Sequence, residues 1–374
     1  MFHTISLAIA LYVVWRLILP LLLSKTLKLV LTAIIVLSAE HQFITRNFFG
    51  SMASPEIPFA WLVPLSWVYG AIMFTGLLLI LKDAIGALSY LAFKTFAKGL
   101  LQSKLVPVLI AGVATTLSAV GVWQAVRVPD VKKIEISLPN LAPGLDGFRM
   151  VQLSDLHASR LLQAPWIDAV VTKTNALNPS LIVITGDLVD GTTQARQDDV
   201  QPLRKLRATL GVYAIPGNHE YYAAYADWIA MFNKLGLRML LNTSVTITHQ
   251  NSSFVLAGVT DTVASNYQEA PPDLTAALER APKNLPIILM AHRPGNAPAN
   301  AKAGVSLQLS GHTHGGQILG FHKVVQLANN GFDSGLFKVG GMQLYVSNGT
   351  GLWPGLPIRL GRESEITEIT LRRL

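Results

Sequence analysis

The stretch VSLQLSGHTHGG, residues 305–316, places an apolar run directly before two histidines, His312 and His314. Its first five residues alternate apolar and polar side chains, which predicts a β-strand. The glycines around the histidines allow a tight turn and a close approach of backbone to a ligand. Two imidazoles so near each other repel when protonated and gain most from a shared metal ion. The stretch therefore predicts a strand that ends at a metal site.

The same arrangement recurs at four other places in the second half of the chain. Each is an apolar, strand-like run followed at once by Asp, Asn or His. In open α/β sheets, ligands bind beyond the carboxyl ends of the strands, so we expect all five ends to form one site. The four further runs end with Asp155 and His157, with Asp187 and Asp190, with Asn218 and His219, and with His292.

The region around these motifs alternates between short β-rich runs and segments with helical spacing, such as 165–177 and 222–235. That alternation predicts helices covering a buried sheet, hence an α/β domain. We place this domain at 149–374, after a linker and first strand at 127–148. Runs predicted as strands are 149–153, 181–185, 211–215, 254–259, 286–290, 305–309, 344–347 and 366–371.

The candidate metal ligands are nitrogen and oxygen donors, because the chain has no cysteine. They are too many for one tetrahedral zinc ion. They suit two divalent ions that share a bridging carboxylate, and a mixed N/O set accepts Mn, Zn, Fe or Mg. Two metals about 3.5–4 Å apart are the usual arrangement for phosphoester hydrolysis. The seven donors are Asp155, His157, Asp187, Asn218, His292, His312 and His314.

The motif order D-x-H, G-D-x-x-D, G-N-H-E, H and G-H-x-H resembles that of the calcineurin-like metallophosphoesterase superfamily. The resemblance covers roughly residues 145–374 and implies a β-sandwich of two sheets flanked by helices. It also implies one role for each ligand. Asp155, His157 and His314 would hold one metal, Asn218, His292 and His312 the second, and Asp187 would bridge the two.

The resemblance gives His219 a different role, as the histidine that protonates the leaving oxygen or stabilises the phosphoryl charge. Asp190 is expected to orient a ligand rather than to bind a metal. The aromatic residues at 221, 222, 225 and 228 have two open interpretations: they line a substrate groove, or they pack in a helix core.

The chain is also similar, more narrowly, to bacterial membrane-associated UDP-2,3-diacylglucosamine pyrophosphatase-like enzymes. This similarity rests on the segments QLSDLH, GHTHGGQ and GLPIRLGRESEITEITL. Tails of that branch place an Arg-Gly pair just before the last segment, whereas this chain has Asn348 in that region. The phosphate-binding role of that arginine is therefore not transferred. Arg359 and Arg293 remain open, each as a contact of substrate phosphate or as half of a structural ion pair.

Residues 1–126 are predicted to be a transmembrane helical region with about four spans, at 2–23, 27–38, 58–81 and 105–126. The run at 27–38 is the shortest of these. A cleaved signal peptide is the alternative for the first run, but a shorter apolar core and a small-x-small site would then be expected. The apolar run at 84–96 is short and flanked by lysines, which favours a position on the membrane surface.

Charge supports the membrane assignment. The chain carries a formal charge of +8, and eight Lys and Arg against three Asp and Glu lie in residues 1–126. This pattern is typical of charges that flank membrane segments, and no nucleic-acid partner is expected. The positive-inside rule favours a cytoplasmic position for the lysine-bearing loops. We therefore expect an integral protein of the bacterial cell membrane with its catalytic domain on the outer face.

These observations predict a membrane-anchored binuclear metallophosphoesterase that cleaves a phosphodiester or pyrophosphate bond. Anchoring holds the site near the bilayer and favours a lipid-linked phosphoester as substrate. Two alternatives stay open, a broad-specificity phosphodiesterase without lipid preference and a non-catalytic metal-binding membrane sensor. A metalloprotease is disfavoured because the chain has no H-E-x-x-H motif. The sequence leaves the oligomeric state open.

Overall fold

The computed structural model describes residues 2–50, 55–353 and 355–374. The chain divides into two compact units. The first unit holds the described part of residues 1–124 together with a returning segment at 355–360, and the second holds residues 125–353 and 361–374.

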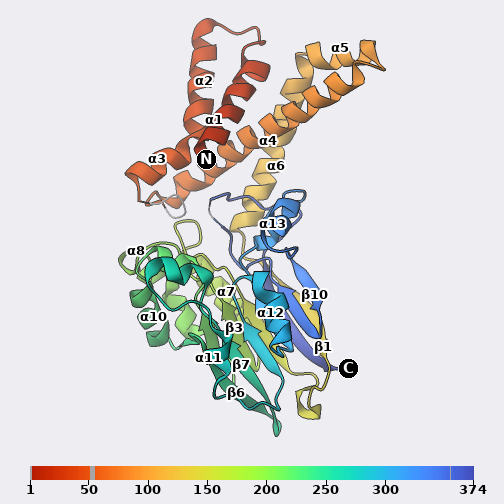
Figure 1. The fold of residues 1–374 in the computed structure, drawn as a ribbon. Helices are drawn as coiled ribbons and strands as arrows, with labels where there is room; N and C mark the ends of the chain where they lie inside the picture. The colour runs from red at the N-terminus through yellow and green to blue at the C-terminus, as the bar shows by residue number, and fades with distance from the viewer. Residues whose placement is uncertain (1, 51–54, 354) are drawn as a thin grey trace. The chain divides into compact units, whose positions relative to one another are not determined.

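The first unit is helical (Figure 1). Two of its helices, α4 and α6, are long and apolar enough to cross a membrane, and the bent pair α2 and α3 would add a third span if it forms one. The apolar helix at 3–18 is shorter, so four spans stay a prediction. The helices are α1 (Phe2–Val13), the π-helix η1 (Val14–Ile18), α2 (Lys25–Ala39), α3 (His41–Phe48), α4 (Phe59–Ser89), α5 (Lys94–Gln102) and α6 (Leu105–Val126).

Helix α4 runs past the predicted end of its span at residue 81 and absorbs part of the run expected at the surface. The charges at its end do not break the helix because they are paired. Asp83 lies 2.6 Å from Arg16 and 2.7 Å from the buried Lys82. Ion pairing of this kind offsets the cost of charge in an apolar bundle.

The returning segment at 355–360 packs into the first unit. The side-chain amide of Gln42 donates to the carbonyl of Gly355 at 2.5 Å, and the backbone N–H of Arg359 donates to the carbonyl of Gly121 at 3.0 Å. The Ile358 side chain fills the space beside Gly70 and Gly121, where an added Cβ would lie 2.2 and 2.5 Å from it. Small residues of α4 and α6 therefore make room for this segment.

The second unit contains two six-stranded sheets, as the predicted β-sandwich requires. All eight predicted strands are present, with ends that differ by at most two residues. The first sheet has the order β1 (Asp130–Leu138), β12 (Glu365–Arg373), β2 (Arg149–Leu153), β3 (Leu181–Thr185), β4 (Val212–Ile215) and β5 (Arg238–Met239). The second has the order β10 (Gly335–Val339), β11 (Met342–Val346), β9 (Leu307–Ser310), β8 (Ile287–Met290), β7 (Ser252–Gly258) and β6 (Thr243–His249).

The core lies between the sheets and beneath the covering helices. Along β3, Leu181 and Val183 pack into the core shared with the second sheet, while Ile182 and Ile184 pack beneath the helices. Both faces of the strand are buried, so its sequence is continuously apolar. Strands β2, β3, β4 and β5 run parallel, as do β7, β8, β9 and β11. Their carboxyl ends therefore meet at one edge of each sheet.

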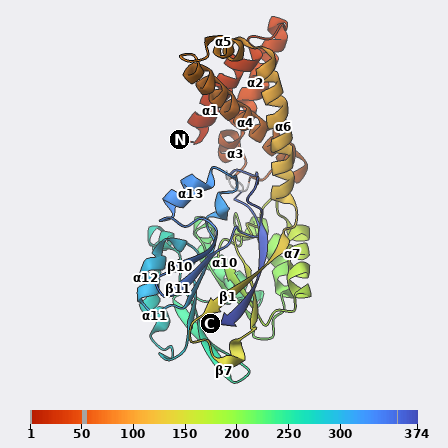
Figure 2. The same ribbon diagram turned by 90° about the vertical axis from the view of Figure 1, so that its right-hand side faces the viewer.

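Helices cover both outer faces of the sandwich (Figure 2). Residues of α7 and α10 pack with the first sheet, and residues of α11 and α12 pack with the second. Helices of this unit are α7 (Ala164–Ala176), α8 (Thr193–Val200), α9 (His219–Tyr222), α10 (Tyr225–Lys234), α11 (Leu274–Leu278), α12 (Ala297–Lys302) and α13 (His322–Ala328). Short 3-10 turns are η2 (Pro143–Leu145), η3 (Gln201–Lys205), η4 (Thr262–Tyr267), η5 (Pro294–Asn296) and η6 (His314–Gly316).

Candidate metal centre

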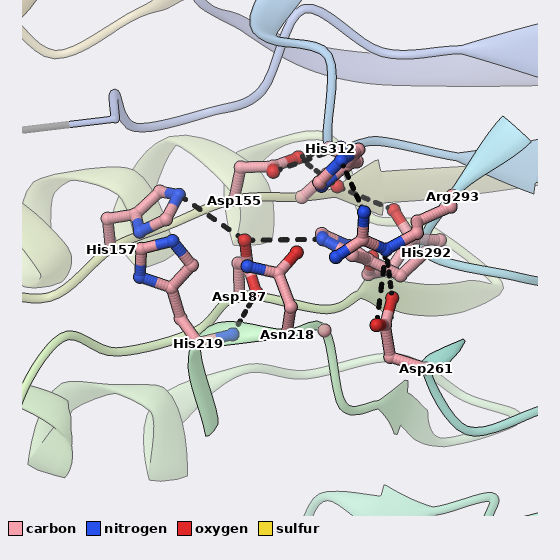
Figure 3. Close-up of polar contacts among 12 residues, drawn as sticks. Asp155, His157, Asp187, Asn218, His219, Asp261, His292, Arg293 and His312 are labelled. Carbon is pink, nitrogen blue, oxygen red and sulfur yellow. Dashed lines mark hydrogen bonds and ion pairs between the residues drawn. The ribbon is translucent and has the colours of Figure 1, made fainter. Parts of the chain in front are cut away.

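The loops after β2, β3, β4, β8 and β9 bring all seven predicted donors and His219 into one cluster, in which His312 and His219 are half-buried and the others are buried (Figure 3). Five of these residues have left-handed backbone angles, which non-glycine residues adopt at a cost of order 1–3 kcal/mol each. Such strain persists only where the surroundings fix it, and it gathers at functional sites. The five are Asp155, His157, Asp187, His312 and His314, with φ of 52°, 45°, 53°, 69° and 50°.

Two glycines let these loops come together. A Cβ at Gly311 would lie 2.2 Å from a carboxylate oxygen of Asp155, and one at Gly217 would lie 2.2 Å from a carboxylate oxygen of Asp187. The same approach lets the backbone N–H of His312 donate to Asp155 at 3.0 Å. Glycine is therefore required at both positions by close packing against a candidate ligand.

One group of donors consists of Asp155, His157 and His314, whose ligand atoms lie within 4.8 Å of one another. The Nε2 atoms of the two histidines are 3.2 Å apart, and Nε2 of His314 is 3.3 Å from Oδ1 of Asp155. Three donor atoms from two strand-end loops, those after β2 and β9, thus face a common point. Their geometry suits a single cation between them.

A second group consists of Asp187, His292 and His312, again within 4.8 Å. Nδ1 of His292 donates to the carbonyl of Thr185 at 2.8 Å, which leaves Nε2 as the ligand atom. Oδ2 of Asp187 lies 3.2 Å from this Nε2 and 3.6 Å from Nε2 of His157. Asp187 therefore stands between the two groups, where a bridging carboxylate would be.

Two buried atoms at this second group support a cation there. Oδ1 of Asn218 has no hydrogen-bond partner among the residues that the structure describes, and Nε2 of His292 has none beyond its 3.2 Å contact with the Asp187 carboxylate. Buried polar atoms without partners are costly, and both are of the kind that binds divalent metals. The donor set therefore fits metal ions, and it contains no sulfur that would restrict the choice of metal.

His219 and Asp190 lie beside the first group. Asp190 contacts Nδ1 of His219 with one oxygen and Nδ1 of His157 with the other. The backbone N–H of His219 also donates to Asp187 at 2.8 Å. One ring nitrogen of His219 lies within 4.8 Å of donor atoms of His157 and Asp187, so geometry alone permits this histidine to act as a ligand as well.

The carboxylates dominate the electrostatics of the cluster. Burial alone would lower the pKa values of His219 and His292, but the neighbouring charges of Asp190 and Asp187 raise them to about 9 and about 10. Burial also lowers the pKa of His312, and the nearby His292 lowers it further. Protons on two histidines therefore offset the carboxylate charge, a role that bound cations would take over.

The sequence did not assign a role to Glu220, the last residue of G-N-H-E. This residue is fully buried, and its carboxylate accepts backbone N–H groups from Gly217 at 2.7 Å and Leu188 at 2.6 Å. It also accepts from Asp187 and Val189 at 3.2 and 3.3 Å. Burial and the charge of Asp187 raise its pKa to about 7. Glu220 thus ties the loop that carries Asp187 to the loop that carries Asn218 and His219.

The sequence left the roles of two arginines open, Arg293 and Arg359. Arg293 lies at the site, where its guanidinium contacts both oxygens of Asp261 and Nε2 of His312. Asp261 was not singled out from the sequence, since it is 32 residues away from its partner. Arg359 is buried in the returning segment of the first unit. Its backbone N–H donates to the carbonyl of Gly121 in α6 at 3.0 Å.

The aromatic cluster is mainly packing. Trp228 is buried and donates to the carbonyl of Gly191, and Tyr221 is buried and stacked on Tyr225. Tyr222 differs, because it is exposed and its hydroxyl accepts a hydrogen bond from the side-chain amide of Asn218 at 3.1 Å. Of the four aromatic residues, Tyr222 is the only one for which the described residues show a hydrogen bond to a candidate ligand.

Residues 148–316 match the family model of the calcineurin-like phosphoesterases. The metallophosphoesterase YkuE of Bacillus subtilis is 34% identical over 61% of this chain and 80% of its own length. A transmembrane protein with metallophosphoesterase domain from Bos taurus is 36% identical over 71% of this chain and 62% of its own. A metallophosphoesterase of Helicobacter pylori strain J99 is 34% identical over 67% and 66%. This chain thus spans less than two thirds of the length of the last two.

Among solved structures, the calcineurin-like phosphoesterase YfkN of Bacillus subtilis aligns with 55% of this chain and 82% of its own, at 14% identity and a TM-score of 0.36. The family itself is established by the sequence relatives. The chain belongs to the calcineurin-like metallophosphoesterases.

Proposed function

We propose that this protein is a membrane-anchored, binuclear metal-dependent phosphoesterase that hydrolyses a phosphodiester or pyrophosphate bond. In this proposal two divalent ions, of Mn, Zn, Fe or Mg, occupy the two donor groups. Asp155, His157 and His314 hold one ion, and Asn218, His292 and His312 hold the other, with Asp187 between them. The observation that carries the proposal is the position of Asp187 between the two groups, 3.2 Å from His292 and 3.6 Å from His157.

Bound at these positions, the ions supply Lewis acidity that neutralises phosphoryl charge and makes water a better nucleophile. The protein fixes the ligands. Thr185 holds the ring of His292 through Nδ1, and Asp190 holds the ring of His157 in the same way. Each contact leaves Nε2 facing the cluster, which sets the tautomer that a ligand needs.

His219 is the proposed proton donor to the leaving oxygen, or the group that stabilises the phosphoryl charge. Asp190 engages its Nδ1, so Nε2 is the nitrogen left to give a proton. The backbone N–H of His219 is held by Asp187 at 2.8 Å. The residue is thus fixed at the same carboxylate that stands between the two donor groups.

A lipid-linked phosphoester is the proposed substrate class, as in the UDP-2,3-diacylglucosamine pyrophosphatase-like branch. The helices α4 and α6, each long and apolar enough to span a bilayer, support membrane anchoring. The related protein of Bos taurus is likewise named a transmembrane protein. The proposed location is the bacterial cell membrane with the catalytic unit on the outer face, because the lysine-bearing loops favour the cytoplasm.

The test uses the full chain, purified in detergent and loaded with Mn, Zn, Fe or Mg in turn. Hydrolysis of bis-4-nitrophenyl phosphate is compared with hydrolysis of a lipid-linked diphosphate in mixed micelles. Variants Asp187→Asn and Asn218→Ala are expected to lose activity, whereas Asp198→Asn, an exposed carboxylate on α8, keeps it. Metal-dependent turnover of both substrates, with preference for the lipid, supports the full proposal.

Other results separate the alternatives. Turnover of the soluble diester with no advantage for the lipid would identify a broad-specificity phosphodiesterase. Two bound metals per chain without turnover of any phosphoester would favour a metal-binding sensor. A folded protein that binds no metal would overturn the ligand assignment.

A further inference from the structure

We propose that Arg293, held in place by Asp261, forms a binding site for a non-bridging oxygen of the substrate's phosphoryl group. This inference rests on the proposed function and adds a residue that the ligand motifs do not contain. The two residues come from the loops after β8 and β7, next to the loop that carries His312 (Figure 3).

One edge of the guanidinium is fixed. Nε of Arg293 lies 2.9 and 3.1 Å from the two carboxylate oxygens of Asp261. Asp261 is itself buried, and Oδ1 also accepts the backbone N–H of Val263 at 2.8 Å. A carboxylate anchored in this way restricts the arginine to one orientation. The side chain of Arg293 is therefore already ordered before a ligand binds, and binding loses less side-chain entropy.

The other edge points at the metal centre. Nη1 of Arg293 lies 3.0 Å from Nε2 of His312, a donor of the second group. If His312 uses that nitrogen for a metal, Nη1 loses its acceptor and must find another within a short distance. The side chain of Arg293 is one-third exposed, so a ligand can reach it from solvent. An oxygen shared with the neighbouring cation would fill that position.

Charge argues for an anionic ligand. A fixed cation beside a site for two divalent cations weakens metal binding by repulsion. One Asp261 carboxylate offsets only the charge of the arginine itself. The arrangement becomes favourable when a phosphoryl group arrives, because guanidinium donors match the geometry of phosphate oxygens. Arg293 is therefore expected to oppose metal binding slightly and to favour phosphate binding strongly.

A purely structural role of the Arg293–Asp261 pair predicts a different effect on metal binding. If the Arg293–Asp261 pair only fastens two loops, its loss would disturb His312 and lower metal affinity along with activity. Metal content and phosphate affinity therefore separate the two roles, and neither depends on turnover.

The experiment compares Arg293→Gln, Arg293→Lys and Asp261→Asn with Arg280→Gln, whose arginine is exposed and remote in sequence from the motifs. The full-length protein in detergent is loaded with Mn, and bound metal is counted by elemental analysis. Calorimetry then measures the affinity of inorganic phosphate, and kcat and KM are measured with bis-4-nitrophenyl phosphate. Thermal unfolding checks that each variant is folded.

We expect Arg293→Gln to keep its metal and to lose roughly 10- to 100-fold in phosphate affinity and in kcat/KM, as for a hydrogen bond to a charged group. Lysine restores the charge without the planar fork and recovers part of the loss. Asp261→Asn frees the arginine and gives an intermediate effect, because Asp261 is a positioning residue. Arg280→Gln behaves as wild type.

Unchanged phosphate affinity in folded Arg293→Gln and Arg293→Lys would overturn the inference. So would loss of metal in parallel with loss of phosphate affinity. The proposed function is tested separately. Wild type that binds metal and phosphate but hydrolyses no phosphoester would refute the proposed function. The effect of Arg293→Gln on phosphate affinity would still decide the inference about Arg293.

Discussion

Nδ1 of His157 lies 3.0 Å from Oδ2 of Asp190, and the other oxygen of the same carboxylate contacts Nδ1 of His219. One buried acid thus orients a candidate metal ligand and the candidate proton donor. A carboxylate behind a ligating histidine fixes its tautomer and makes it a stronger ligand. In the proposed function, Asp190 would therefore couple metal binding to proton transfer through these two contacts.

Asp190→Asn is expected to weaken metal binding about 10- to 100-fold, because the amide keeps the shape but not the charge. Turnover under saturating metal should still fall, since His219 loses the same partner. Metal titration by calorimetry and kcat at saturating metal measure the two effects separately. Asp198→Asn serves as the control. Equal metal affinity in Asp190→Asn and wild type would refute this role.

The positions of these donors could be predicted from the sequence because each follows an apolar strand. In β3, both faces are buried, so the run LIVIT is continuously apolar and the polar residues begin where it ends. Parallel pairing of β2, β3 and β4 then brings the ends to one edge. Local pattern and sheet topology together were sufficient to predict that these side chains lie close together.

Contacts between distant loops could not be predicted in this way. Asp261 meets Arg293 across 32 residues, and the returning segment at 355–360 meets α4 and α6 across more than 200. Neither contact leaves a periodic pattern in the sequence. The edge strands β6 and β10 were also missed. Both are only partly buried, and in β10 the apolar Leu336 lies on the exposed side, so burial does not give the strand a clear alternation.

Glu220→Gln is expected to lower the free energy of unfolding by about 1–3 kcal/mol. Oε1 accepts from Leu188 and Val189, and Oε2 accepts from Gly217 and Asp187. Whichever oxygen becomes an amide nitrogen, two backbone donors then face another donor. Thermal unfolding in detergent measures the change, and Glu279→Gln, at an exposed position, is the matched control. If the two variants unfold alike, Glu220 does not hold the two loops together.

Metal binding is expected to release protons at neutral pH. With a pKa of about 10, His292 is protonated at pH 7 before metal binds, and a ligating nitrogen must be free of its proton. Affinity should therefore rise with pH from 7 towards 10 and level off above the pKa of His292. A pH indicator in weak buffer records the release, and His292→Ala should release fewer protons. Metal binding without proton release in wild type would contradict the assignment of His292 as a ligand.

The packing of Ile358 against α6 gives a prediction for the first unit. A Cβ at Gly121 would lie 2.5 Å from Cγ2 of Ile358, whereas a Cβ at Gly112 of the same helix meets nothing within 4 Å among the described residues. Gly121→Leu should therefore destabilise the helical unit by about 1–3 kcal/mol through overpacking. Gly112→Leu gains helix propensity without a clash and should be neutral or stabilising. Unfolding temperatures in one detergent compare the two variants, which share residue type, helix and substitution.

Equal unfolding temperatures of the two variants would mean that the returning segment does not pack against Gly121 in solution. A lower temperature for Gly121→Leu alone, restored in part by Ile358→Ala, would locate the loss of stability at that contact.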